Sequence, residues 1–203
     1  KQHAPGNAPF DDPTIQTEQT AYWIARQIGL PWNCKRYIAL VVNGVRRGTL
    51  MEDTQVPGAD VIEELFPGDT DGDLFKFQAW YEFDNSTSGK ANYDIVSWCT
   101  LNDYTTTGGA KKQARYRWNY ATRANRDTAN DYHHVFDLID AANTPTNGPY
   151  RFNLERIVDM GQWMRTLAFE HAVGNWDCFG GIQGQNMYGY KTDTNRWKLL
   201  TWD

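Results

Sequence analysis

The stretch GNWDCFGGIQGQNMYGYKTDTNRWKLLTWD, residues 174–203, decides how the rest of this chain is interpreted. A glycine-rich loop carries Asp177 and ends at Asn186. The residues that follow place aromatic side chains at alternate positions, which predicts a strand with its tyrosines on one face. After a polar turn, a second strand is predicted at 197–202. The hairpin returns Asp203 to the loop it started from, so that two acids and one amide can meet.

These three polar side chains suit phosphoryl transfer. Asp, then Asn, then a two-stranded hairpin, then Asp is the order in which kinases place their catalytic base and magnesium ligands. Magnesium takes hard oxygen ligands, so one carboxylate and one amide oxygen can hold it beside the phosphates. A second carboxylate can then orient the attacking hydroxyl. The alternative is that all three are ordinary turn residues, because Asn and Asp are favoured in turns.

Length and composition narrow the class of protein. A chain of 203 residues predicts one domain with one core. The net charge is −5 and no basic block is present, which argues against a nucleic-acid partner. The sequence contains no run of eighteen apolar residues and therefore predicts no membrane span. The cysteines form no CxxC pair, which excludes a zinc knuckle and leaves one disulfide plus a thiol, or three buried thiols. They are Cys34, Cys99 and Cys178.

The first half of the chain mixes helix and strand signals. Helices are predicted at 14–28 and 59–66, and strands at 36–42, 45–56 and 74–83. Asn43-Gly44 between the first two strands is a strong hairpin signal. Gly48 within the return strand marks either a bulge or a close approach to the backbone. The third strand carries Lys76, which is either an edge-strand charge or a phosphate-orienting lysine.

The second half is predicted to be mainly helical. The expected elements are a strand-like core at 94–101, an amphipathic strand within 115–126 and helices at 128–142 and 154–173. Asn153 is expected to cap the last helix, with Met164 in its buried stripe, and Gly174 ends it. The arginines and aromatic residues of 115–126 could also bind sugars or bases. His133 and His134 are adjacent on a helix, so they point apart and are expected at the surface.

Several short motifs occur in an order found in one known family. They are Ile28-Gly29-Leu30-Pro31, Val42-Asn43-Gly44 with Gly48, Glu52, Leu74-Phe75-Lys76, Asn175-Trp176-Asp177, Gly184-Gln185-Asn186-Met187-Tyr188 and Trp202-Asp203. Together they resemble the CotH kinase family, the spore-coat protein H kinases, a divergent branch of the protein-kinase-like fold. The resemblance covers most of the chain.

The resemblance implies how a nucleotide would be bound. Lys76 would contact the phosphates of ATP, with Glu52 as its ion-pair partner. Glu63 or Glu64 on the short helix could pair with Lys76 instead.

The resemblance also implies how the reaction would proceed. Asp177 would orient or deprotonate the acceptor hydroxyl, while Asn186 and Asp203 would hold magnesium or manganese. The implied function is an atypical kinase that transfers the ATP γ-phosphate to Ser or Thr of a secreted or surface protein. Extracellular or cell-surface placement follows from the same resemblance.

Two other functions are compatible with the residues. One is a non-catalytic module on the same fold, which would bind glycans or a protein through its nine Trp and eleven Tyr. The other is a glycoside hydrolase that uses paired acids.

The expected fold class is α+β, a divergent protein-kinase-like fold. One domain over 1–203 would combine an antiparallel, nucleotide-covering sheet at about 14–114 with a mainly helical part at about 115–203. The helical part would carry the catalytic loop and the metal-binding hairpin. The family pattern has further strands upstream and ends in WDxD, so we expect a piece truncated at both ends and inactive in that form. The segment 84–114 has no counterpart in that pattern.

Overall fold

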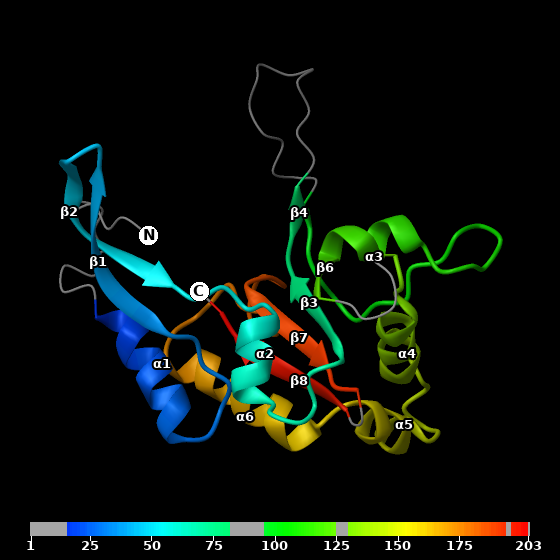
Figure 1. Ribbon diagram of the computed structural model, residues 1–203. Coiled ribbons are helices and arrows are strands. Elements are labelled where there is room, and N and C mark those ends of the chain that lie inside the picture. The colour runs from blue at the N-terminus through cyan, green and yellow to red at the C-terminus, as the bar shows by residue number, and fades with distance from the viewer. Residues whose placement is uncertain (1–15, 82–95, 125–129, 194–195, 203) are drawn as a thin grey trace, which may run out of the picture.

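A computed structural model describes residues 16–81, 96–124, 130–193 and 196–202, and it is a mixed α+β structure (Figure 1). The helices are α1 (Thr17–Gln27), α2 (Ala59–Leu65), α3 (Gln113–Asn119), α4 (His133–Ala142), α5 (Tyr150–Ile157) and α6 (Met160–Ala172). The strands are β1 (Lys35–Val42), β2 (Val45–Thr54), β3 (Asp73–Phe77), β4 (Trp80–Tyr81), β5 (Val96–Ser97), β6 (Tyr120–Ala124), β7 (Met187–Lys191) and β8 (Trp197–Thr201). Of the helices in these ranges, none has the length and apolar character needed to cross a bilayer.

The central sheet has the strand order β6-β3-β7-β8, and every neighbouring pair is antiparallel. We expected the strand of Lys76 to belong to a sheet formed by the first half of the chain. Instead, β3 lies between β6 and β7, which both come from the second half (Figure 1). Leu74, Phe75 and Phe77 are fully buried, so each face of β3 carries buried apolar side chains. A strand of this kind is best placed inside a sheet, because packed elements can then cover both of its faces.

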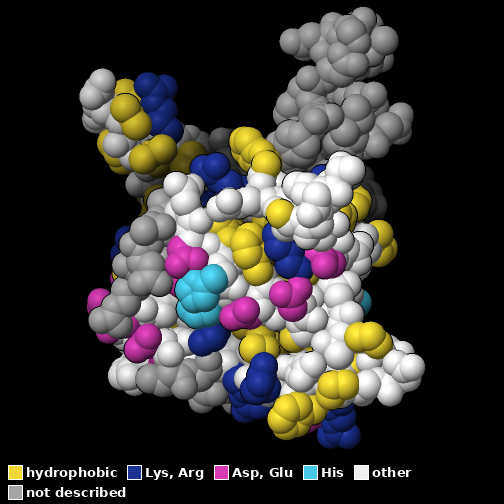
Figure 2. All heavy atoms as spheres, turned by 90° about the vertical axis from the view of Figure 1, so that its right-hand side faces the viewer, with side chains coloured by type: hydrophobic (Ala, Val, Ile, Leu, Met, Phe, Trp, Pro, Cys, Tyr) yellow, Lys and Arg dark blue, Asp and Glu magenta, His cyan; other side chains and the backbone are white. Residues whose placement is uncertain are grey.

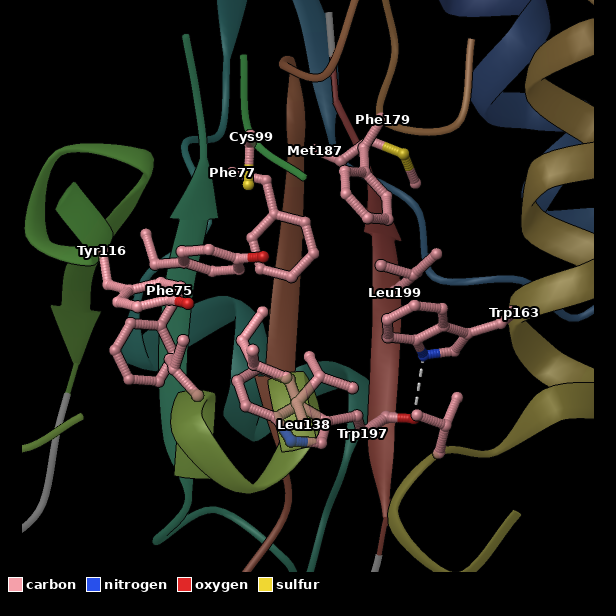
Figure 3. Packing of buried hydrophobic residues seen from close by; sticks show 14 of the residues in the cluster. Phe75, Phe77, Cys99, Tyr116, Leu138, Trp163, Phe179, Met187, Trp197 and Leu199 are labelled. Carbon is pink, nitrogen blue, oxygen red and sulfur yellow. Dashed lines mark hydrogen bonds between the residues drawn. The ribbon is translucent and has the colours of Figure 1, made fainter. Parts of the chain in front are cut away.

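The two faces of the sheet are covered by different helices. On one face, Phe75, Phe77, Trp197 and Leu199 pack with residues of α3, α4, α5 and α6 (Figure 3). On the other face, α2 packs against a second cluster that contains both tyrosines of β7. The prediction that these tyrosines share a face is therefore confirmed. That second cluster consists of Val61, Ile62, Leu74, Tyr188, Tyr190 and Leu200.

Gly189 lets the aromatic core approach β7 closely. A Cβ atom at this position would lie 2.4 Å from Cζ of Phe77 and 3.0 Å from the ring of Trp197. Real Cβ atoms do not approach carbon that closely. Glycine is therefore the residue that allows Phe77 to pack close against the strand.

Side chains of α6 form hydrogen bonds with the outer edge of β8. The side chain of Gln162 donates to the carbonyl of Leu199 at 2.7 Å and accepts from the amide of Leu199 at 2.9 Å. Trp163 Nε1 donates to the carbonyl of Trp197 at 3.0 Å (Figure 3). A primary amide carries the same donor and acceptor as a peptide group, so Gln162 takes the place of a neighbouring strand. An edge that would otherwise be unpaired is thereby satisfied.

Strands β1 and β2 form a separate two-stranded ribbon that projects from the sheet (Figure 1). Asn43 and Gly44 at its tip have φ values of 52° and 77°, as a type I′ turn requires, which confirms the hairpin signal. The register shifts between Ile38 and Leu40, opposite a stretch of β2 that begins at Gly48. With a φ of 69°, Gly48 lies at this irregularity, as the bulge interpretation predicts.

The long helix predicted at 154–173 is in fact two helices. Val158 is extended and forms a parallel bridge with Trp197, and the amide of Asp159 donates to the carbonyl of Trp197 at 3.1 Å. The backbone between α5 and α6 therefore pairs with β8 and does not continue the helix. Asp159 caps α6 by accepting from the amide of Gln162, and the expected cap, Asn153, lies inside α5. Met164 is exposed.

The segment predicted as one amphipathic strand at 115–126 also differs. It forms α3, which buries Tyr116 and Asn119, and then β6. Those two residues are three positions apart, a helical spacing that alternation of arginine and aromatic residues conceals. The cysteines are free thiols, with Cys99 and Cys178 buried and Cys34 exposed.

Candidate functional site

The loop that carries Asp177 begins at a well-defined helix end. Gly174 has a φ of 79°, and its amide donates to the carbonyl of His171 at 3.2 Å. The amide of Asn175 donates to the carbonyl of Glu170 at 2.9 Å. These two bonds form a Schellman motif, in which glycine takes the left-handed conformation that other residues avoid. The motif turns the chain sharply from α6 into the Asp177 loop.

Asp177 and Asn186 are in direct contact. Oδ2 of Asp177 accepts from Nδ2 of Asn186 at 2.8 Å and from Nε2 of Gln185 at 3.0 Å. Asn186 has a φ of 52°, a left-handed conformation that is uncommon for a residue other than glycine. Such backbone strain often accompanies a functional position, because the surrounding structure must hold it. The structure thus brings together two of the three residues that the hairpin was expected to join.

The third residue of that set, Asp203, lies outside the described residues. Its predecessor Trp202 is described, and the carbonyl of Trp202 accepts a hydrogen bond from the side chain of Asn175 at 3.4 Å. Trp202 is therefore in contact with the loop that carries Asp177.

Asp177 lines a cavity of about 250 Å³ between α1, α6, the loop and the end of β8. The walls are partly apolar, and they include Tyr22, Phe169 and Trp202. Glu170 of α6 is a second carboxyl in this cavity, and it was not singled out from the sequence. The usable signal would have been an acid in the last turn of a helix, where the helix dipole disfavours negative charge.

Glu170 is only 2% exposed. Burial raises the pKa of its carboxyl from 4.5 to about 7, against the opposing effect of a hydrogen bond from Asn175, and the charge of Asp177 raises it further. A buried carboxyl with a raised pKa that lies in a cavity is a frequent feature of active sites.

Lys76 lies on the face of the central sheet that α2 covers, directly across from Tyr188 of β7. Burial lowers the pKa of its ammonium group, and the nearby charge of Arg123 lowers it further. Arg123 also acts on Tyr188, whose pKa is raised by burial and lowered by the charge of Arg123 and a hydrogen bond from it. Lys76 and Arg123 thus form a pair of like charges beside one tyrosine. The sequence indicated a possible binding role for the arginines of 115–126, but it did not predict that Arg123 lies near Lys76.

The expected ion pair between Lys76 and Glu52 is not formed. Nζ of Lys76 has no carboxylate oxygen within 4.0 Å in the described parts of the chain. Glu52 is buried on β2 and acts electrostatically on Tyr22 of the cavity. Glu63 and Glu64 of α2 are exposed, and Glu64 lines a different hollow beside β1 and β2. Glu52 therefore belongs to the cavity side of the site, away from the lysine.

Two aromatic residues connect the basic pair to the cavity. The rings of Tyr188 and Trp202 lie 5.5 Å apart in an edge-to-face arrangement. Trp202 lines the cavity of Asp177, and Tyr188 faces Lys76. The cations and the carboxylates therefore lie on either side of one aromatic contact. Such an arrangement can bind an anionic ligand at one end and a hydroxyl at the other.

The histidines do not provide an alternative centre. On the face shown in Figure 2, histidine side chains lie among acidic and basic groups. Nδ1 of His134 is 2.6 Å from Asp73, and Nδ1 of His133 is 2.6 Å from Asp131. Within the residues that the structure describes, no group of three or more His, Cys, Asp or Glu side chains could hold a metal ion. His133 and His134 thus each contact a different carboxylate.

The chain is similar to a known protein family. The family model described as CotH kinase protein matches residues 7–203. The match agrees with the resemblance drawn from the motifs and extends over nearly the whole chain. A search of curated proteins found no match.

Proposed function

The chain belongs to the CotH kinase family, and from this we propose that it is an atypical kinase on a protein-kinase-like fold. Family membership implies ATP as the phosphate donor. We place the reaction at the cavity of Asp177, with transfer of the γ-phosphate to a Ser or Thr hydroxyl. The observation that carries the proposal is the 2.8 Å contact between Asp177 and Asn186, which joins a carboxylate and an amide separated by a nine-residue step in sequence.

Asp177 is assigned the role of orienting or deprotonating the acceptor hydroxyl. Its carboxylate lies in a cavity with partly apolar walls, and two side-chain amides hold one of its oxygens. Fixing the carboxylate in this way prepares it for a hydroxyl before the substrate arrives.

Lys76 and Arg123 are assigned to the phosphates. Two neighbouring cations with a lowered lysine pKa favour the binding of an anion, because a bound phosphate offsets their repulsion. Glu52, placed near Tyr22, is better suited to support the cavity wall than to pair with Lys76.

The oxygen donors present fit magnesium or manganese. Asn186 offers an amide oxygen next to the Asp177 carboxylate. Trp202 lines the cavity and is followed in the sequence by Asp203. Asn186 and Asp203 would hold the ion, which when bound offsets charge on the phosphate oxygens. Because the described residues contain no cluster of three metal-binding side chains, the remaining ligands would be phosphate oxygens and water.

The acceptor is proposed to be a secreted or cell-surface protein, and the chain itself is proposed to act outside the cell. This assignment rests on the family alone.

The proposal is tested by phosphate transfer from labelled ATP with magnesium, comparing wild type with Asp177→Asn. We expect the variant to bind Mg-ATP and to lose transfer by roughly 10²–10⁴-fold, the contribution of a general base. His171→Ala, which changes an exposed side chain near the end of α6, serves as the control. The chain is instead a binding module if wild type transfers no phosphate, if Mg-ATP leaves its melting temperature unchanged, and if glycans raise that temperature.

A further inference from the structure

We propose that Glu170 is a positioning residue, which through Asn175 holds the Asp177 loop and the chain leaving β8 in one arrangement. The inference rests on the proposed kinase function and extends it to a residue outside the matched motifs. It assigns a supporting role to a buried acid of α6 that lines the same cavity as Asp177.

The contacts form a continuous connection across three segments. The amide of Asn175 donates to the carbonyl of Glu170 at 2.9 Å, and the side-chain nitrogen of Asn175 donates to Oε2 of Glu170 at 2.8 Å. The same nitrogen reaches the carbonyl of Trp202 at 3.4 Å. Asn175 is two residues before Asp177, and Trp202 immediately precedes Asp203. Glu170 thus anchors, through one amide, both segments that carry the proposed site.

The position of Glu170 is unfavourable for folding. It lies at the third residue from the end of α6, where the helix dipole opposes a negative charge. It is buried, and Oε1 has no hydrogen-bond partner among the described residues. An acid in such a place lowers stability, so its presence suggests a role in the site.

Several ionisable groups face Glu170 from the elements around it. They are Glu18 and Tyr22 on α1, and Asp177 and Cys178 in the loop. Glu52 on β2 acts on Tyr22, as Glu170 does. Of these, Glu18 is paired with Lys35. Asp177 is the carboxylate that the charge of Glu170 would repel. A neutral Glu170 accepts from Asn175 without repelling Asp177, whereas an ionised one disfavours the same loop conformation.

The test compares Glu170→Ala, Glu170→Gln and Asn175→Ala with wild type, with His171→Ala as the exposed control on the same helix. Glutamine retains an acceptor for Asn175 and carries no charge, whereas alanine removes the acceptor. We expect Glu170→Ala and Asn175→Ala to lower kcat roughly 10- to 100-fold, as the loss of supporting contacts does. We expect the wild-type rate to fall above neutral pH as Glu170 ionises, and we expect Glu170→Gln to keep most of kcat and to lack this fall.

A readout independent of catalysis is amide hydrogen exchange in the absence of nucleotide. Faster exchange at both 175–178 and 199–202 in Glu170→Ala, with recovery in Glu170→Gln, supports the positioning role. If wild type transfers no phosphate but this pattern is present, the kinase function fails and the positioning role stands. If wild type transfers phosphate while the alanine variants keep its rate and its exchange pattern, or if Glu170→Gln behaves like Glu170→Ala, the inference is overturned.

Discussion

Replacing Glu170 by Gln should make the stability of the protein less sensitive to a rise in pH from about 4.5 to about 7. Below pH 4.5 the carboxyl is neutral in the folded and unfolded chain, so its ionisation has no effect on stability. Between pH 4.5 and about 7 the unfolded chain releases the proton while the folded chain retains it, and stability therefore falls. Above pH 7 both states are ionised and the loss remains constant.

The size of this loss follows from the two pKa values. A difference between 4.5 and about 7, at 1.36 kcal/mol per pKa unit, gives about 3 kcal/mol at pH 8. At 2% exposure solvent screens the carboxyl little. For a chain of 203 residues this corresponds to a melting-temperature difference of roughly 6–12 °C. Glutamine cannot ionise, so the variant should lack this part of the decline.

The assay is chemical denaturation of wild type and Glu170→Gln at several pH values from 4 to 9. The informative quantity is the change in unfolding free energy with pH, because any constant packing effect of the amide cancels. Glu63→Gln makes the same chemical change at an exposed position and should follow the wild-type curve. Asp177→Asn should reduce the decline, since it removes a charge that raises the pKa of Glu170. Parallel curves for wild type and Glu170→Gln would refute the assignment of a raised pKa.

Two further predictions concern the sheet and its basic face. Gln162→Leu should lower the unfolding free energy by about 2–4 kcal/mol, measured by urea denaturation, because it leaves the buried amide and carbonyl of Leu199 unpaired. A loss below about 0.5 kcal/mol would mean that β8 does not depend on this edge contact. Lys76→Met should reduce kcat/KM for ATP by roughly 10²–10³-fold, the usual effect of losing one charge-stabilising group. Its melting temperature should not fall, because burial already disfavours the charge, and unchanged ATP kinetics would exclude Lys76 from the phosphates.

Much of the local structure could be predicted from the sequence. The Asn43-Gly44 turn, the glycine end of the last helix at Gly174 and the shared face of Tyr188 and Tyr190 are all present. These features depend on residues that are close in sequence and on backbone conformations that few residue types adopt. The meeting of Asp177 and Asn186 belongs to the same class, because one loop and one hairpin bring them together.

Contacts between distant segments could not be predicted in this way. The pairing of β3 with β6 and β7 depends on which apolar faces bury each other, and a strand with two apolar faces fits several partners equally well. The division of the last helix at Val158 reflects a backbone pairing with Trp197, thirty-nine residues later, which no helical periodicity records.

The sequence by itself determined the family, the loop that brings Asp177 and Asn186 together, and the hairpin that follows this loop. Only the tertiary structure decided that Glu52 faces Tyr22 instead of Lys76, and that Arg123 lies beside that lysine. It also decided that Glu170 is buried against Asp177 with a raised pKa. The physical reason is that ionisation and electrostatic pairing depend on distance and on exclusion of water, and both are set by packing between segments far apart in the chain.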